Sequence, residues 1–183
     1  STTCSERRNK LARVSFADGL GSLLNRTERL EWCVGQLTQL IKNIPKPDAE
    51  HAQRAAHFCK NDLVSQIVGE FPELQGLMGS KYLFKEGESK NVALAVYEHY
   101  LPKGADDELP KTTAGTILAL AERLELLLSI YAKGERPSGS SDPYGLRRAG
   151  NGILLLLWNK GWCLDLIEML KIFSINWQKL FPA

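Results

Sequence analysis

The chain has 183 residues, enough to bury the core of one domain, and its 44% hydrophobic and 24% charged residues are ordinary for a soluble globular protein. Its net charge of +2 neither demands nor excludes a nucleic-acid partner, so any basic binding surface would have to be local. The longest apolar run, ILLLLW at 153–158, is far too short to span a bilayer, and we expect no membrane partner.

The cysteines and the first residues indicate the compartment. The four cysteines are widely separated and form no CxxC pair, which argues against a zinc site and fits free thiols in a reducing environment. The polar start, STTCSERRNK, has no signal-peptide pattern. We therefore expect a cytoplasmic protein.

Helical periodicity begins at Leu20. Apolar residues spaced three and four apart predict a long helix from Leu20 to Ile44. The run IPKPD at 44–48 ends it, because proline cannot continue a helix. A second helix is predicted from an N-cap at Asp48 as far as Val68.

The stretch EFPELQGLMG at 70–79 is unusual for its two glycines. Pro72 suits the first position of a third helix that runs to the KEGES turn at 85–89. In such a helix Gly76 and Gly79 would share one face and allow a neighbouring helix to come close. Gln75 would be the polar group beside that contact.

The fourth and fifth helices have clear start signals. Ser89 is the predicted cap of a helix that ends before Pro102. Thr113 is the predicted cap of the next, which carries a strong apolar stripe from Ile117 to Tyr131.

The remaining chain adds a loop and two more helices. The loop KGERPSGSSD at 133–142 ends in Asp142, the predicted cap of a helix with Pro143 at its first position. A shorter helix is predicted at 164–173. These signals predict an all-α fold of about six to eight helices. We expect one domain over 1–183, with a lead-in segment at 1–18 and less distinctive C-terminal helices at 153–183.

The loop before the sixth helix contains a candidate anion site. Glycine and serine residues leading into a helix N-terminus offer backbone N–H groups, and arginine makes bidentate phosphate contacts. The candidate nucleic-acid-binding residues are Arg136, Ser138, Gly139, Ser140, Arg147 and Arg148. The alternative is a plain loop with an Asp-Pro cap, whose arginines form internal salt bridges.

A metal-dependent active site is poorly supported. A helical phosphohydrolase of the HD type needs an isolated histidine, a His-Asp dipeptide and a distant aspartate to hold its cation. The chain has three histidines and no His-Asp dipeptide; the nearest equivalent is Asn61-Asp62, and an amide is a poor ligand. We predict no catalytic residue and no metal, and expect each histidine to lie on the surface or in the packed core.

Three sequence blocks carry a resemblance to a known family. They are an acidic-Phe-Pro-Glu-Leu-Gln-Gly-x-Met-Gly block at 70–79, a Glu-His-Tyr-x-Pro block at 98–102, and a Gly-Ser-x-Asp-Pro-aromatic block ending in paired arginines at 139–148. Their order and spacing resemble the β subunit of bacterial-type, heterotetrameric glycyl-tRNA synthetase. The similarity covers roughly 7–152, including the lead-in VSFADGLGSLLNRTERL at 14–30.

The resemblance implies an HD-like helical domain taken from a longer subunit. Such a domain would support attachment of glycine to its tRNA without being the aminoacylation site. The implied partners are glycine tRNA, the α subunit and the remaining β-subunit domains. ATP and magnesium would be used on the α subunit, so no cofactor is expected in this domain.

The chain departs from the family pattern near the implied HD pocket. Glu122 and Glu125 stand where aspartates are usual, and Asn25-Arg26 stands where Asp-Lys is common. Glu122 keeps the charge but is one methylene longer. The residues of this degenerate pocket would be Asn61, Asp62, Gln75 and Glu122.

Two other functions remain open. One is a metal-dependent HD-type phosphohydrolase that uses Asp62 and Glu122 with a histidine. The other is a helical docking module for neighbouring domains, which predicts a contiguous apolar surface with Trp158, Trp162 or Trp177 exposed.

Overall fold

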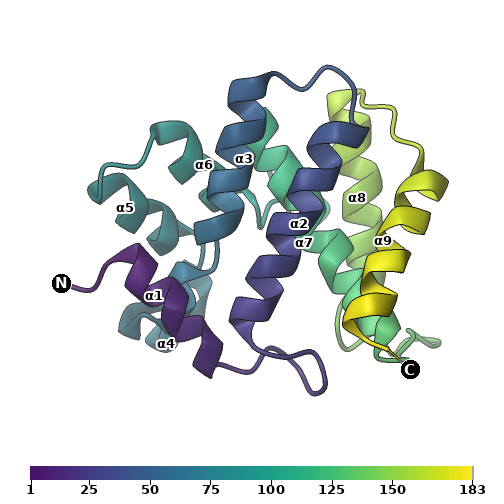
Figure 1. Ribbon diagram of the computed structural model, residues 1–183, viewed down its shortest axis with the longest axis horizontal. Coiled ribbons are helices and arrows are strands. Elements are labelled where there is room, and N and C mark those ends of the chain that lie inside the picture. The colour runs from purple at the N-terminus through teal and green to yellow at the C-terminus, as the bar shows by residue number, and fades with distance from the viewer. Residues whose placement is uncertain (183) are drawn as a thin grey trace.

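The computed structural model describes residues 1–182, which form helices and connecting turns without a β-strand (Figure 1). The all-α prediction is therefore confirmed. The described residues contain nine α-helices, of which α4 is a single short turn. The helices are α1 (Cys4–Lys10), α2 (Leu23–Leu40), α3 (Lys46–Phe58), α4 (Gln66–Glu70), α5 (Leu77–Lys85), α6 (Lys90–Glu98), α7 (Thr113–Ala132), α8 (Leu146–Lys160) and α9 (Leu166–Leu180).

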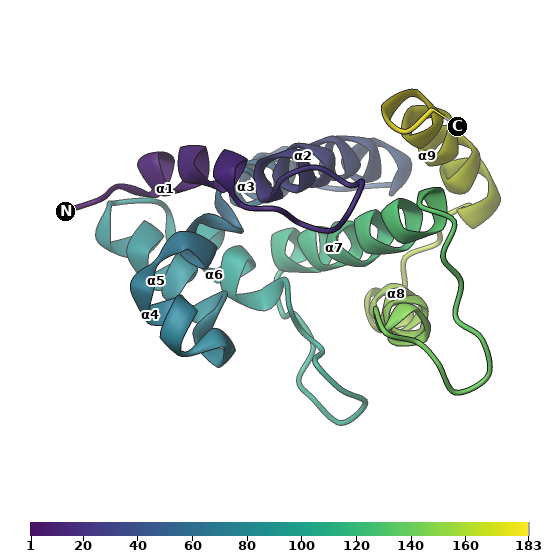
Figure 2. The same ribbon diagram turned by 90° about the horizontal axis from the view of Figure 1, so that it is seen from below.

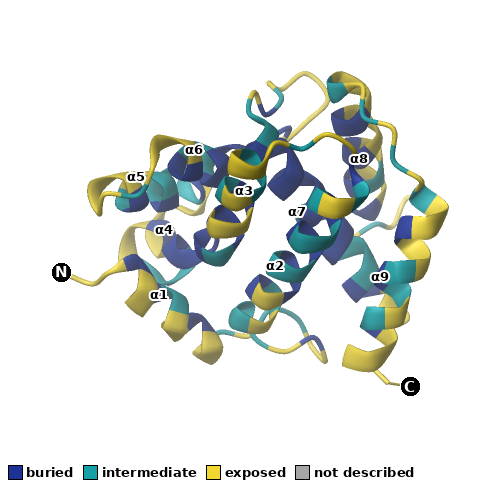
Figure 3. Ribbon diagram, turned by 45° about the horizontal axis from the view of Figure 1, so that its top comes forward, coloured by how far each residue is buried: buried dark blue, intermediate teal, exposed yellow. Residues whose placement is uncertain are grey.

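Helix α7 is the centre of the fold. It contacts α2, α3, α6, α8 and α9, and it lies between the layer of α2 and α3 and the separate helix α8 (Figure 2). Ala114, Gly115 and every residue from Ile117 to Ala121 are buried, so no side of its first half faces water (Figure 3). A helix that is apolar all round belongs inside a protein. This explains the strong apolar stripe seen in the sequence.

Hydrogen-bonding side chains set several helix starts. The Ser89 hydroxyl accepts from the Val92 N–H and begins α6, as predicted. Helix α7 begins one residue earlier than expected, because Thr112 and not Thr113 is its cap. Helix α2 starts at Leu23 and not Leu20, since Ser22 forms a capping box with Asn25.

The second predicted helix is shorter than expected. Helix α3 begins at Lys46, directly after Pro45, so Asp48 lies in its first turn and is not the N-cap. The helix ends at Phe58, and a 3-10 turn at Asn61–Val64 and helix α4 follow. The extension to Val68 was therefore wrong.

The EFPELQGLMG stretch is not the start of one continuous helix. Pro72–Leu74 form a 3-10 turn, and α5 begins only at Leu77. Gly76 lies between them with φ of +83°, a left-handed conformation that favours glycine. The prediction that Gly76 and Gly79 share a helix face was wrong, because Gly76 lies outside the helix.

The C-terminal third contains both expected helices. Helix α8 has Gly145 at its N-cap position, so Asp142 and Pro143 lie outside it. Helix α9 runs from Leu166 to Leu180 and is longer than predicted. Among the described residues, no helix combines the length and the apolar character that crossing a membrane requires.

Candidate functional site

An open cavity of about 550 Å³ lies beside α7. Its walls come from the turn at Pro72–Gln75, the segment after α6 at 100–103, the middle of α7 and the start of α8. Three predicted residues, Gln75, Glu122 and Arg148, line this one cavity. Asn61 and Asp62 are fully buried and are not part of its lining.

The surroundings of Asp62 and Tyr100 explain why glycine stands at positions 76 and 79. Its Oδ2 accepts hydrogen bonds from the N–H groups of Gly76 at 2.7 Å and Gly79 at 2.9 Å. A Cβ at Gly79 would lie 3.2 Å from the Asp62 carboxylate, and a Cβ at Gly76 would lie 2.7 Å from Cδ2 of Tyr100. The glycines therefore leave room for a buried carboxylate and an aromatic ring. Asp62 caps α5 and holds the Pro72–Gln75 turn at the cavity mouth.

Asp62 and Asn61 are committed to structural contacts. Burial raises the pKa of Asp62, although the two N–H donors oppose this shift. Its second oxygen, Oδ1, has no hydrogen-bond partner within residues 1–182. Asn61 accepts from Nε of Arg7 at 3.1 Å and donates to the Phe58 carbonyl at 2.8 Å.

A lysine that sequence reasoning missed occupies the centre of the site. Lys60 is 1% exposed, and its Nζ lies 2.8 Å from Oε2 of Glu122, 3.0 Å from the Tyr100 hydroxyl and 3.1 Å from Nε2 of His99. Burial alone would lower the pKa of Lys60, but the Glu122 carboxylate raises it above its ordinary value. The lysine is therefore a permanent buried cation.

His99 completes this arrangement as a neutral imidazole. Its Nδ1 contacts the Val96 carbonyl and its Nε2 contacts Nζ of Lys60. These contacts assign the proton to Nδ1 and leave Nε2 as an acceptor for the ammonium. Burial, together with the Lys60 charge, lowers the pKa of His99 to about 3.

The charge network continues along α7 towards α2. Arg26 contacts Glu122 and Glu125, each at 2.8 Å, and Nε of Arg29 lies 2.9 Å from Glu125. Burial would raise the pKa of Glu122, but Arg26 and Lys60 lower it well below its usual range. The cluster, which we call the charge centre, contains three cations and two carboxylates: Arg26, Arg29, Lys60, Glu122 and Glu125.

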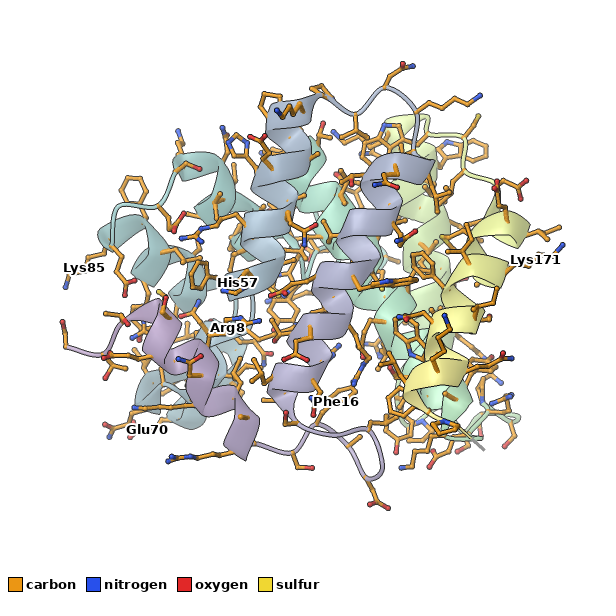
Figure 4. All side chains as sticks on the ribbon, in the orientation of Figure 1. Arg8, Phe16, His57, Glu70, Lys85 and Lys171 are labelled. Atoms are coloured by element: carbon orange, nitrogen blue, oxygen red, sulfur yellow. The ribbon has the colours of Figure 1, made fainter. Side chains whose placement is uncertain are left out.

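The charge centre does not fit a catalytic metal. Within residues 1–182, no group of three or more His, Cys, Asp or Glu side chains is arranged to hold a metal ion. The Lys60 ammonium takes the space between Glu122 and His99 where a cation would sit. His57 lies elsewhere, in a surface cluster where its Nδ1 is 2.7 Å from Glu31 and Arg8 is 2.8 Å from the same carboxylate (Figure 4).

The loop before α8 uses most of its polar groups internally. The Asp142 carboxylate accepts from the N–H groups of Leu146 at 2.8 Å and Arg147 at 2.9 Å, so a protein carboxylate already occupies this helix N-terminus. The Arg147 N–H group lowers the pKa of Asp142. Ser138 and Ser141 pair through both backbone N–H groups.

The three predicted arginines lie in different surroundings. Arg136 stacks on the Tyr131 ring at 4.2 Å and donates to two backbone carbonyls. Arg147 donates to the Gly139 carbonyl at 2.6 Å. Arg148 lines the cavity, and its side chain forms no hydrogen bond or ion pair with the rest of the described chain. Among the three, Arg148 has the guanidinium best placed to meet a ligand.

Comparison with known proteins shows which family the chain belongs to. A family model described as glycyl-tRNA synthetase beta subunit matches residues 1–180. The chain belongs to this family. The glycine–tRNA ligase beta subunit of Acaryochloris marina is 47% identical over 88% of the chain and 22% of the relative. Those of Trichodesmium erythraeum and Chromohalobacter salexigens are 43% and 45% identical, over 94% and 91% of the chain and 24% of each relative.

The chain thus spans about a quarter of the length of these glycyl-tRNA synthetase beta subunits. All three blocks that carry the sequence resemblance reach the same cavity. The first block supplies the Pro72–Gln75 turn, the second supplies Tyr100 and Pro102, and the third supplies Tyr144 and Arg148. The segments are far apart in the sequence, so their meeting is a property of the fold.

Proposed function

We propose that this chain is the HD-like helical domain of a glycine–tRNA ligase β subunit, where it helps to hold glycine tRNA during ATP-dependent charging. It is not itself the aminoacylation site, and it needs no cofactor of its own; ATP and magnesium act on the α subunit. The observation that carries this proposal is the cavity at which the three family blocks meet, with Arg148 unpaired at its edge.

The expected tRNA contacts are electrostatic. Arg147 and Arg148 are exposed at the start of α8, and Arg136 lies in the preceding loop with Ser138, Gly139 and Ser140. Because guanidinium groups neutralise backbone phosphates and release counterions, their contribution falls as salt rises. Arg148 should contribute most, since Arg147 and Arg136 already donate to protein carbonyls.

A salt titration tests this proposal. The double variant Arg147→Ala/Arg148→Ala, in the complete ligase that contains this domain, should bind glycine tRNA more weakly. Each lost phosphate contact should reduce the salt slope of the binding constant by about 0.7–0.9. Lys85→Ala is the control, because Lys85 lies on α5, away from the cavity (Figure 4). An unchanged affinity and salt slope in the double variant would contradict the proposal.

A second candidate function is docking of another part of the β subunit. Helices α8 and α9 leave large apolar side chains in water, led by Trp158 at 87% and Ile167 at 69% exposure. Trp162 is partly buried, and Trp177 is buried against Phe173. The relatives are about four times longer than this chain, so we propose that the part of the β subunit outside this chain covers the exposed apolar side chains of α8 and α9.

The docking proposal has its own test. The separately produced remainder of the β subunit should bind this chain, and Trp158→Ser/Ile167→Ser should weaken the complex. Self-association of the chain through Trp158 and Ile167, without binding to the remainder, would contradict it. A metal-dependent phosphohydrolase has no comparable support, because Lys60 fills the position between Glu122 and His99.

A further inference from the structure

We propose that the cavity between Gln75, Tyr100, Arg123 and Arg148 binds a single unstacked nucleotide, through its phosphate and the edge of its base. The inference rests on the proposed function, because the nucleotide would belong to bound tRNA. The volume of the cavity, about 550 Å³, is within the range of small-ligand sites, roughly 300–1,000 Å³.

The first argument is an excess of buried positive charge. Arg123 is 8% exposed and lines the cavity, where its guanidinium donates to the carbonyls of Ala119 at 3.0 Å and Pro102 at 2.9 Å. No carboxylate of residues 1–182 forms an ion pair with it. A buried cation held only by neutral carbonyls is unfavourable unless an anion approaches.

The surrounding charges do not cancel Arg123. The charge centre already has more cations than carboxylates. In the cavity lining itself, Arg123 stands beside Glu122, whose carboxylate is already paired with Arg26 and Lys60. Lys103 and Arg148 add two cations to the cavity lining, and Glu73 adds one carboxylate. The lining therefore has three cations and two carboxylates, an excess of positive charge that favours an anion.

A glycine on α8 leaves room for the Arg123 side chain. A Cβ at Gly152 on α8 would lie 2.5 Å from Nε of Arg123, so only glycine leaves this side chain where it is. Helix α8 thus packs directly over a guanidinium that lines the cavity. Arg148, one turn earlier on the same helix, approaches the cavity from its rim.

The second argument is a surface for a base. Tyr100 and Tyr144 line the cavity. The Tyr100 ring already packs against His99, with 3.9 Å between ring centroids, and against the Lys60 ammonium, so Tyr144 is the ring offered to a base. Aromatic rings are the common stacking partners of unpaired bases. Gln75 donates one N–H to the Pro72 carbonyl at 2.9 Å, which leaves an amide oxygen and a second N–H for a base edge. A lining with an excess of cations, the Tyr144 ring and one free amide edge together suit a nucleotide better than a free phosphate.

Calorimetric titration of this chain with adenosine 5′-monophosphate, adenosine and inorganic phosphate separates the two halves of the site. Arg148→Ala should weaken monophosphate binding about tenfold and leave adenosine binding unchanged, because it removes a charge-assisted phosphate contact. Gln75→Ala should weaken the monophosphate and adenosine but not phosphate. Lys85→Ala is the control, and unchanged thermal unfolding shows that each variant is folded.

Competition with glycine tRNA decides the source of the nucleotide. Displacement of the bound monophosphate by tRNA supports both the nucleotide site and the proposed function. Binding of tRNA without any binding of the monophosphate would overturn the nucleotide site and leave the proposed function intact. A bound monophosphate that tRNA does not displace would support the site for a free nucleotide and contradict its use for tRNA.

Discussion

Replacement of Lys60 by methionine tests the charge centre most directly. Methionine retains much of the lysine stem and leaves little empty space, but it removes the ammonium. The Glu122 oxygen at 2.8 Å then loses its partner, and so do Nε2 of His99 and the Tyr100 hydroxyl. The variant therefore isolates the effect of the buried charge.

The expected loss of stability follows from these contacts. Breaking a buried ion pair by removing one partner costs about 3–5 kcal/mol. We expect a value near the lower end, about 3 kcal/mol, because Arg26 still holds the other Glu122 oxygen at 2.8 Å. The double variant Lys60→Met/Glu122→Gln should lose less than the sum of its single variants, since the two residues are directly coupled.

Urea unfolding at several pH values gives the measurement. With Lys60 present, the lowered pKa of Glu122 contributes stability above pH 4.5, which is lost as the pH falls. Without Lys60, the pKa of the buried carboxyl is lowered less, so the deficit of the variant should shrink as the pH falls below 4.5. A deficit below about 1 kcal/mol that does not change with pH would refute the reasoning.

Three further predictions concern single positions. Gly76→Ala should destabilise the protein by about 1–3 kcal/mol in urea unfolding, because it strains a left-handed backbone and overlaps Tyr100, whereas Gly69→Ala, with open space around it, should not destabilise it. The free energy of unfolding should fall from pH 6.5 towards pH 5 by up to about 1.4 kcal/mol per pH unit, because unfolding lets His99 take up a proton that the folded state excludes. An equally steep fall of the unfolding free energy with pH in a folded His99→Gln variant would contradict this. A thiol reagent should modify only Cys163 in the native protein, because the other three cysteines are buried; rapid modification of a second thiol would show otherwise.

Local patterns predicted much of the fold because they depend on nearby residues. The cap at Ser89 and the apolar stripe of α7 can both be seen within one or two helical turns. The break at Gly76 could not be found this way, since it depends on the carboxylate of Asp62, which lies outside that helix. Pro72 alone is equally compatible with an α-helix and a 3-10 turn.

The candidate site was also predicted only in part, because some of its residues belong to local sequence blocks and others depend on distant contacts. Gln75, Glu122 and Arg148 were chosen from blocks of sequence, and the fold brings them to one cavity. Lys60 was missed because a lysine normally points to solvent. Its burial depends on partners from two other segments, Glu122 on α7 and His99 after α6, which no local pattern reveals. Its place directly before Asn61-Asp62 was the available signal.

The lysine at the charge centre has a consequence for how this protein depends on its surroundings. A metal ion between a carboxylate and an imidazole can be removed by a chelator, replaced by a competing ion or lost when supply falls. The ammonium of a lysine side chain is covalently part of the protein, so it is present from synthesis onwards and cannot be replaced by another ion. It keeps positive charge at this position but cannot activate water as a Lewis acid does. The contacts of Lys60 therefore hold this part of the fold together independently of metal supply.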